Sequence, residues 1–411
     1  MINFTSIFLL AVWQIINLFW AIRISRNVVS FAFLANVILT LNLIGSIVLA
    51  KLVYYENLRS SLYLLFLSSM INIGVFLANY IFRRYPNEQI VGLEKRNLLW
   101  SRTYLISIRI YFFIAVLVTV LFFTTTGIPV LSEDLELTRK AFTLTEGANF
   151  YYRVTDIAMP MLAAAAITLC FGRVPYGKYR RNVVILLIIT ATTLLLLGFK
   201  GKVLWFMVLS MMTVSLYIEG KLLRKWVIIL SALGVISGIV VTQLIYEAGP
   251  IRALVKLIQR STIDAAGGFN ILVYEYLPRV GRSDVEGRLQ NYLFEWKFPG
   301  SARTELGAFG LTVTLAGSLI YYFGIAGLVL GIIFGFVGRL FELIAYRKRR
   351  NPILAAGCIY ITYSMLGLLN RGVSSNYLEW TLSSAVFFIL TLGFMFWIFR
   401  YSQTRVYKKH G

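Results

Sequence analysis

Charged side chains, histidine and cysteine are all scarce in this sequence. Charged residues make up 14% of the chain, with one histidine and two cysteines, whereas a soluble domain has about 25% charged residues. An ordinary soluble globular protein is therefore excluded. His410 is the last residue but one, so a histidine triad or histidine acid–base pair outside the membrane is excluded as well. Cys170 and Cys358 both lie in apolar runs, which predicts buried thiols and no disulfide or metal framework.

Long apolar runs extend from the first residues to Phe399, and 58% of the 411 residues are hydrophobic. About 20 helical residues cross a bilayer, and these runs do not alternate as β-barrel strands do. The sequence therefore predicts an all-α, polytopic integral membrane protein with a single transmembrane domain over 1–411 and about 11–12 transmembrane helices. The first run has no basic segment before it and no cleavage site after it, so we expect a retained span. Eleven spans are expected at 2–22, 28–50, 61–82, 103–126, 156–171, 183–198, 203–218, 226–246, 324–343, 352–369 and 381–399.

The net charge of +22 comes mostly from one of two sets of loops that alternate along the chain. One set of loops holds 22 basic and two acidic residues, and the alternate set holds 16 basic and 14 acidic residues. The first set is therefore expected in the cytoplasm, with the N-terminus outside and the C-terminus inside. Because topology explains the charge, we expect no nucleic-acid partner. The basic set is 23–27, 83–102, 172–182, 220–225, 347–350 and the tail from Arg400.

Two of the loops expected outside are long. They cover 127–156 and 247–306, whereas neighbouring helices are usually joined by about 2–8 residues. Loops of this length usually carry function. The apolar stretch 307–323 that follows is expected to be an interfacial or half-inserted helix, because a full span there would put the basic residues 347–350 outside.

Arginines gather in and beside the larger outer loop. The planar guanidinium matches phosphate oxygens and keeps its charge at any working pH, which predicts binding of a lipid-linked phosphate or diphosphate at the headgroup level. The alternative is that these side chains touch only anionic headgroups, or pair with the acidic residues Asp264, Asp284, Glu286 and Glu295. The six arginines are Arg252, Arg260, Arg279, Arg282, Arg288 and Arg303.

Two short outer turns also carry cations. The turn 198-GFKGK-202 holds Lys200 and Lys202 between glycines, where backbone amides and ammonium groups can approach an anion; a tight turn with snorkelling lysines is the alternative. The turn 370-NRGVSSNYLEW-380 adds Arg371 among amides and hydroxyls that suit a hydroxyl-rich ligand. Ordinary helix capping is its alternative.

Aromatic and glycine patterns each have two interpretations. Within 291–298 every second residue is aromatic, including Trp296. An extended strand would place these rings on one face that holds sugar rings, and an aromatic belt at the membrane interface is the alternative. The spacing of Gly327, Gly331 and Gly335 predicts close helix packing, within the chain or in a dimer.

These features together resemble the oligosaccharide repeat-unit polymerases, the Wzy-type O-antigen or capsule polymerases. The resemblance is carried by the two long outer loops, the Lys/Arg hairpin 198–202, the glycine-rich stretch 304–331 and the late Arg-Gly turn 371–380. It implies a fold related to C-type integral membrane glycosyltransferases in the bacterial inner membrane. It also implies that undecaprenyl-diphosphate-linked oligosaccharide units are joined on the periplasmic face into O-antigen, capsule or exopolysaccharide. A chain-length regulator and a flippase of the same pathway are the implied protein partners.

The resemblance and the chemistry together suggest roles for individual residues. Lys200 stands where many relatives have an arginine, and Arg371 matches the late Arg-Gly turn. A diphosphate leaves as a stabilised anion, so fixed cations are needed more than a general acid, and we expect neither a metal nor another cofactor. Expected in catalysis are Lys200, Arg282, Arg303, Arg371 and the base Glu305, with Asp156 and Glu379 as further candidate bases. Expected in substrate binding are Arg153, Arg252, Arg260, Arg279, Arg288, Lys202 and Trp296.

Three other functions compete with the polymerase. A ligase that moves finished polysaccharide onto a lipid core would share the donor, but we expect it to carry an outward histidine. A membrane O-acyltransferase would want a histidine in the membrane region. A flippase or transporter of the same lipid-linked sugars predicts short loops and charges lining a cavity. Against it stand the loop 247–306 and the expectation that no ionisable residue lies near the middle of a span.

Overall fold

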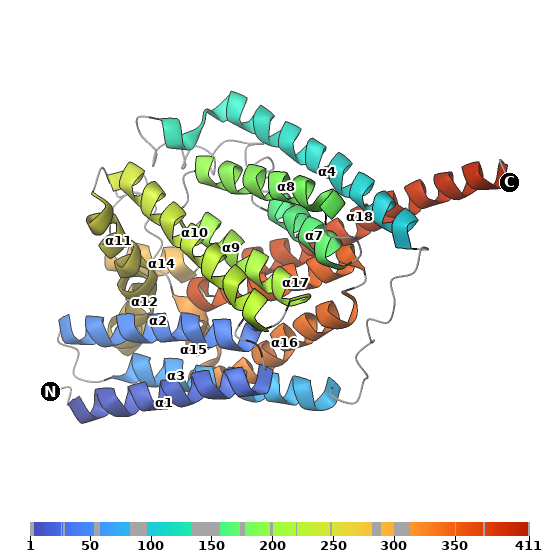
Figure 1. Cartoon of the computed structure of the whole chain (residues 1–411). Helices are drawn as coiled ribbons and strands as arrows, with labels where there is room; N and C mark the ends of the chain where they lie inside the picture. Colours follow the sequence, from blue (N-terminus) through green and yellow to red (C-terminus); the bar gives the residue numbers. More distant parts are fainter. Residues whose placement is uncertain are drawn as a thin grey trace. The chain divides into compact units, whose positions relative to one another are not determined.

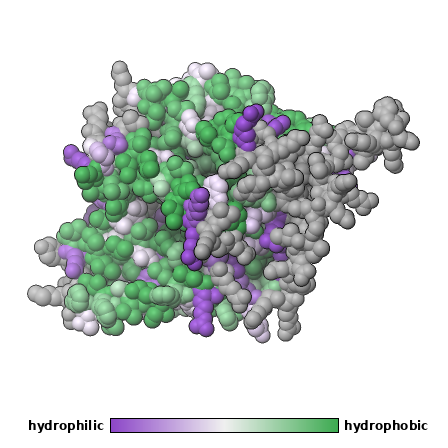
Figure 2. All heavy atoms as spheres, in the orientation of Figure 1, coloured by the Kyte–Doolittle hydropathy of each residue, from purple (hydrophilic) through white to green (hydrophobic). Residues whose placement is uncertain are grey.

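Helices make up all the regular structure that the computed structural model describes. Eight of its helical stretches are long and apolar enough to cross a membrane, which confirms the prediction of a polytopic helical membrane protein. Hydrophobic residues also cover most of the coloured surface in Figure 2. The structure describes residues 4–25, 27, 29–52, 58–82, 97–132, 157–172, 177–197, 200–218, 220–246, 249–281, 289–299, 313–349, 351–372 and 375–409.

The eight long apolar stretches coincide with eight of the eleven expected spans. Six of them lie in α1 (Phe4–Ser25), α2 (Phe31–Leu52), α3 (Arg59–Phe82), α10 (Gly220–Tyr246), α17 (Pro352–Arg371) and α18 (Ser375–Lys409). A seventh runs from α4 (Asn97–Thr126) through the 3-10 turn η1 (Pro129–Leu131). The eighth joins a 3-10 turn, η5 (Ile325–Leu330), to α16 (Gly331–Arg347).

The other three expected spans are shorter apolar helices. They are α7 (Met159–Gly172), α8 (Gly177–Leu196) and α9 (Lys200–Ser215). A helix of 14 residues such as α7 is about 21 Å long, which is less than the roughly 30 Å of a bilayer core. The count of 11–12 spans is thus confirmed for eight helices and stays a prediction for the others.

The chain divides into two compact units. The first unit consists of Met1–Pro86, Leu254–Glu342 and Thr362–Trp380, and the second of Asn87–Ala253, Leu343–Ile361 and Thr381–Gly411. Four helices give residues to both units, namely α16, α17, α18 and α11 (Pro250–Gln259). The prediction of one transmembrane domain is not tested by this division.

In the first unit, α1, α2 and α3 lie side by side (Figure 1), and glycines bring α16 close to α3. A Cβ atom added to Gly335 would overlap the carbonyl oxygen of Ile71, and one added to Gly74 would overlap that of Ile332. A Cβ atom on Gly331 would lie 2.7 Å from the Leu67 side chain. The predicted packing role of the glycine pattern within the chain is therefore confirmed.

A seam of buried amides and hydroxyls joins α1, α2 and α3. Asn36 Nδ2 donates to Asn72 Oδ1 at 2.8 Å, and Asn72 Nδ2 donates to the Asn17 carbonyl at 3.1 Å. Gln14 Nε2 donates to Thr40 Oγ1 at 2.8 Å. Such groups need partners inside the protein because the bilayer core offers no water, so these bonds fix how the three helices face one another.

A buried ion pair in α16 continues this polar seam. Arg339 Nη1 donates to Glu342 Oε2 at 2.7 Å, and the two side chains are 9% and 2% exposed. Arg339 Nε donates to Asn79 Oδ1 at 2.9 Å, and the Phe31 N–H donates to Glu342 Oε2 at 3.3 Å. The sequence predicted a span over 324–343, which placed this pair at the end of the span. In the structure α16 continues to Arg347, so the pair lies farther inside the helix than expected.

We predict that Gly335→Ala destabilises the protein by about 1–3 kcal/mol, because the added methyl group overlaps the backbone of α3. Gly393→Ala in α18 is the matched control, since a Cβ there meets nothing within 4 Å. The control is expected to keep or raise stability, because alanine favours the helix by about 0.5–1 kcal/mol. Thermal unfolding of both variants in detergent micelles measures the difference, and equal melting temperatures would contradict the close approach of α3 and α16.

Candidate functional site

A long helical segment, 250–280, occupies much of the stretch expected as the larger outer loop. It consists of α11 (Pro250–Gln259), a π turn η3 (Arg260–Asp264), α12 (Ala265–Ile271), a second π turn η4 (Leu272–Tyr276) and α13 (Leu277–Val280). Gly281 ends it with a φ of +76°. Two π turns in one helix are uncommon and occur often at functional sites. The outer position of 247–306 stays a prediction, but its described residues are mostly helical.

Close contacts hold this segment against α2 and α3 in the first unit. A Cβ atom on Gly45 would overlap the carbonyl oxygen of Thr262, so the two backbones touch. Asn270 Nδ2 donates to Ser46 Oγ at 3.1 Å, and Asn270 Oδ1 accepts from Ser60 Oγ at 2.7 Å. The Tyr274 hydroxyl accepts from the Ser60 N–H at 3.2 Å, which satisfies a backbone donor in the first turn of α3.

An aromatic cluster forms where the second π turn meets α14 (Leu289–Lys297). The fully buried ring of Tyr276 lies edge-on to Trp296 at 5.2 Å and to Tyr292 at 5.9 Å, and it is tilted against Tyr321 at 6.1 Å. Because 289–297 is helical, the extended strand considered for 291–298 is wrong. Residues 292 and 296 are four apart, a spacing that puts them on one face of a helix as well as of a strand.

An ion pair lies beside the aromatic cluster. Lys297 Nζ donates to Glu275 Oε2, with the two side chains 34% and 16% exposed. Glu275 belongs to the second π turn and Lys297 ends α14. Neither residue stands out in the sequence, because the partners are 22 positions apart and no local pattern connects them.

A second group of polar residues forms where the end of α17 meets the start of α15 (Thr314–Phe323). Gly372, with a φ of +74°, lies so close that an added Cβ would overlap Ser318 Oγ and stand 2.9 Å from the Thr314 carbonyl oxygen. Asn42 Nδ2 of α2 donates to Asn370 Oδ1 at 2.9 Å. The late Arg-Gly turn is therefore packed against α15 and α2.

The start of α15 is strained. Thr314 is fully buried and has a φ of +58°, a conformation that costs a β-branched residue roughly 1–3 kcal/mol. Its hydroxyl accepts from the Gly317 N–H at 3.3 Å. Nearby, Asn42 Oδ1 is buried and has no hydrogen-bond partner among the described residues. Strained backbone and an orphaned polar atom often mark a binding or catalytic site.

We define this group of residues, Asn42, Thr314, Ser318, Asn370 and Gly372, as the polar turn, and it is the candidate functional site. Arg371 is the last residue of α17, so its backbone belongs to the polar turn. Trp296 belongs to the aromatic cluster instead. Both groups lie in the first unit and contact α15, the polar turn at its first residues and the aromatic cluster at Tyr321.

The remaining predicted site residues are spread over the chain. Arg252 and Arg279 are exposed on α11 and α13. Arg260 lies 3.9 Å from Asp264 across one helical turn, which favours the alternative of pairing with loop acids for this arginine. Arg260, Arg279, Trp296 and Arg371 belong to the first unit, whereas Lys200, Lys202 and Arg252 belong to the second. Arg153, Asp156, Arg282, Arg288, Arg303 and Glu305 lie outside the described residues.

Lys200 and Lys202 lie in the first turn of α9, whose first residue is Lys200. The prediction that they sit in the turn itself is therefore corrected. A helix N-terminus carries free N–H groups and a partial positive charge, and two lysines add to this charge. Among the residues that the structure describes, no three His, Cys, Asp or Glu side chains gather in a group that could hold a metal ion.

Comparison of the chain with protein-family models, with curated proteins and with solved structures gives no match.

We predict that Gly372→Ala destabilises the protein more than Gly127→Ala does. Each glycine directly follows a helix and has a φ of +74° or +78°, so each alanine carries a backbone strain of about 1 kcal/mol. Only residue 372 also meets Ser318 and Thr314, whereas a Cβ at residue 127 meets nothing within 4 Å. Denaturation of the two variants in micelles measures the difference, and equal losses would show that α17 does not pack on α15.

Proposed function

We propose that this protein is a membrane glycosyltransferase that polymerises oligosaccharide repeat units linked to undecaprenyl diphosphate. The observation that carries the proposal is the polar turn, where Gly372, the residue after Arg371, packs against the strained start of α15, and where Asn42 Oδ1 has no partner among the described residues. An all-helical membrane architecture is in accord with a lipid-linked substrate. Transfer of the growing chain to a new unit would yield O-antigen, capsule or exopolysaccharide.

The proposed reaction is a displacement at a sugar C1 atom. A hydroxyl oxygen of the acceptor unit forms the new bond to C1, and the bond from C1 to the diphosphate oxygen breaks. The lipid diphosphate leaves as an anion, and the acceptor proton passes to a carboxylate, for which we propose Glu305. Arg371, with Arg282 and Arg303, supplies fixed positive charge where the anion forms, so the reaction needs no metal.

The aromatic cluster supports a sugar-binding role. Tyr292 and Trp296 are only partly buried, so ring area is left for contact with the apolar face of a sugar. The Glu275–Lys297 ion pair beside them offers charged groups that can hydrogen-bond hydroxyls. Because α15 contacts both groups of residues, one helix connects the proposed diphosphate end of the substrate to the proposed sugar end.

We predict that Arg371→Ala lowers the rate of polymerisation at least 100-fold, since removing one preorganised donor to a developing anion costs about 10²–10³ in rate. Arg371→Lys is expected to restore part of this loss, because it keeps the charge and loses the bidentate fork. The exposed Arg23 at the end of α1 gives the matched control Arg23→Ala, with an unchanged rate. The assay uses protein reconstituted in liposomes with the lipid-linked oligosaccharide and separates products on a gel; a full ladder from Arg371→Ala would refute the proposal.

A flippase or transporter of the same lipid-linked sugars is the second candidate. It is favoured by the buried Arg339–Glu342 pair and by the polar seam of α1, α2 and α3, because intramembrane charges often mark a transport path. The buried pair therefore counts against our expectation of uncharged spans, which had disfavoured a flippase. The ion pair also has a purely structural role in joining α16 to Asn79 and Phe31.

One pair of variants separates the two candidates. Arg339→Met alone leaves Glu342 buried without its partner, and we predict a loss of about 3–5 kcal/mol of stability. Arg339→Met with Glu342→Leu replaces the pair by apolar groups, and we predict near-normal stability and normal polymer ladders. If the double variant is stable in thermal unfolding but no longer moves labelled lipid-linked sugar across liposomes, the transport function is supported instead.

A further inference from the structure

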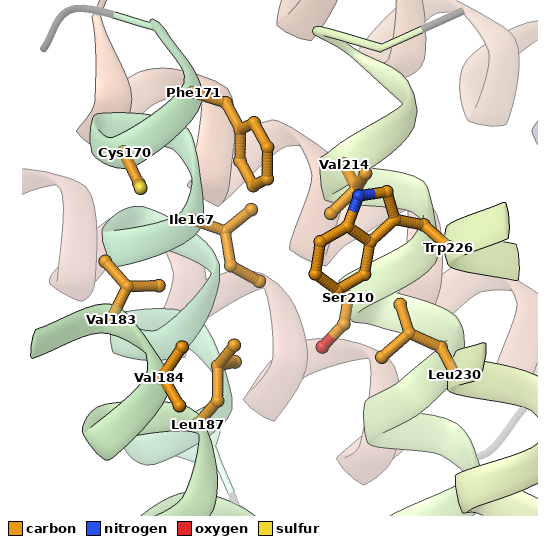
Figure 3. Close-up of a pocket in the computed structure, with 10 residues that line it drawn as sticks. All are labelled: Ile167, Cys170, Phe171, Val183, Val184, Leu187, Ser210, Val214, Trp226 and Leu230. Atoms are coloured by element: carbon orange, nitrogen blue, oxygen red, sulfur yellow. The ribbon is translucent and has the colours of Figure 1, made fainter. Parts of the chain in front are cut away.

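The second unit contains a cavity that the proposed reaction does not use. It measures about 60 Å³ and lies between the helix pairs α7 and α8 on one side and α9 and α10 on the other (Figure 3). Nine of its ten lining residues are apolar, aromatic or cysteine, and the tenth is Ser210. In Figure 3 the rings of Phe171 and Trp226 lie on opposite sides of the cavity, with their planes nearly perpendicular and their centroids 6.4 Å apart.

Water is a poor occupant of this space. The cavity has room for several water molecules, since one needs about 10–15 Å³, but each would require two to four polar partners. Ser210 Oγ is the only hydroxyl on the wall, its side chain is 2% exposed, and it has no hydrogen-bond partner among the described residues. An apolar wall whose polar groups are one hydroxyl and the indole N–H of Trp226 fits a segment of a hydrocarbon chain.

The cavity opens onto a surface that suits lipid. Val184 lines the cavity and is 44% exposed. Along the same helices, Ile188 of α8 and Ile228 of α10 are 58% and 67% exposed. Exposed aliphatic side chains on helices of a membrane protein face acyl chains, so a chain from the bilayer can enter beside Val184.

Three cations lie in sequence beside residues at one end of the cavity. The lining residues of α8 and α10 lie near the starts of these helices, and those of α7 and α9 lie near the ends. Arg181 precedes the lining residue Val183 by two positions, and Arg224 and Lys225 directly precede Trp226. All three cations are exposed, so their long side chains can reach a headgroup at this end.

A fourth cation is held in place by the backbone of the α9–α10 connection. Arg349 Nη1 donates to the Leu216 carbonyl at 3.3 Å, and the Tyr217 hydroxyl donates to the Arg349 carbonyl at 2.8 Å. The Tyr217 ring is stacked on Phe171, with centroids 6.5 Å apart. Arg349 is therefore connected to the cavity wall through Tyr217, which contacts the lining residue Phe171.

We propose that the cavity binds part of one acyl chain of an anionic phospholipid, whose phosphate is bound by Arg224, Lys225 and the neighbouring cations Arg181 and Arg349. The apolar wall selects a hydrocarbon chain, and the charge of the rim selects an anionic headgroup over a zwitterionic one. Trp226 lies between the apolar wall and the charged rim. An indole ring is favoured at such a boundary between acyl chain and headgroup. The bound lipid then completes the packing of α7, α8, α9 and α10.

The test is native mass spectrometry of the delipidated full-length protein titrated with phosphatidylglycerol or with phosphatidylcholine of the same chains. We expect the first phosphatidylglycerol to bind about tenfold more tightly than the first phosphatidylcholine. Ser210→Leu, which fills the cavity, is expected to weaken the binding of phosphatidylglycerol about tenfold. Ser210→Ala keeps the space and is expected to bind within about twofold of the unchanged protein.

The charged rim is tested separately, with exposed residues whose replacement leaves the core intact. Arg224→Gln with Lys225→Gln is expected to remove the preference for phosphatidylglycerol, whereas the control, Arg23→Gln with Lys51→Gln in the first unit, is expected to keep it. Equal binding of the two lipids, unchanged binding to Ser210→Leu, or an equal loss in the control pair would each overturn the proposal. Displacement of phosphatidylglycerol by a prenyl phosphate at equimolar concentration would also overturn it, because the occupant would then be a prenyl lipid.

Discussion

The close approach of two backbones at Gly45 is the contact on which the candidate site depends. Because residue 45 has no side chain, the helical segment 250–280 lies directly against α2, and Asn270 reaches both Ser46 and Ser60. The segment in turn supports α15, since Gly317 fits against Phe269. The strained start of α15 and the end of α17 then meet in the polar turn. A larger residue at position 45 would therefore change the site without touching it.

The bilayer imposes a second constraint, because polar groups inside it need partners from the chain itself. In the first unit, amide and hydroxyl bonds among α1, α2 and α3 and the Arg339–Glu342 pair meet much of this need. In the second unit, Ser210 lines an apolar cavity and its hydroxyl has no hydrogen-bond partner among the described residues. We place ligands beside two of the groups that have no partner among the described residues, Asn42 Oδ1 and Ser210 Oγ.

The sequence predicted the positions of the helices better than their contacts. Long apolar runs are a local signal, and each of the eleven expected spans coincides with a helix. The glycine pattern at Gly331 and Gly335 was also a local signal for packing. The ion pairs Glu275–Lys297 and Arg339–Glu342 and the docking at Gly45 were missed, since burial and long-range pairing decide them. The aromatic spacing in 291–298 fits both a helix and a strand, so the sequence alone could not decide between them.

The proposed polymerase breaks one bond between a sugar and a lipid diphosphate for each repeat unit that it adds. The most direct measurement is the amount of free undecaprenyl diphosphate released by purified protein in liposomes, divided by the number of repeat units joined. We expect one molecule of lipid diphosphate for each new linkage. Movement of the lipid-linked sugar across the bilayer with no release of lipid diphosphate would contradict it.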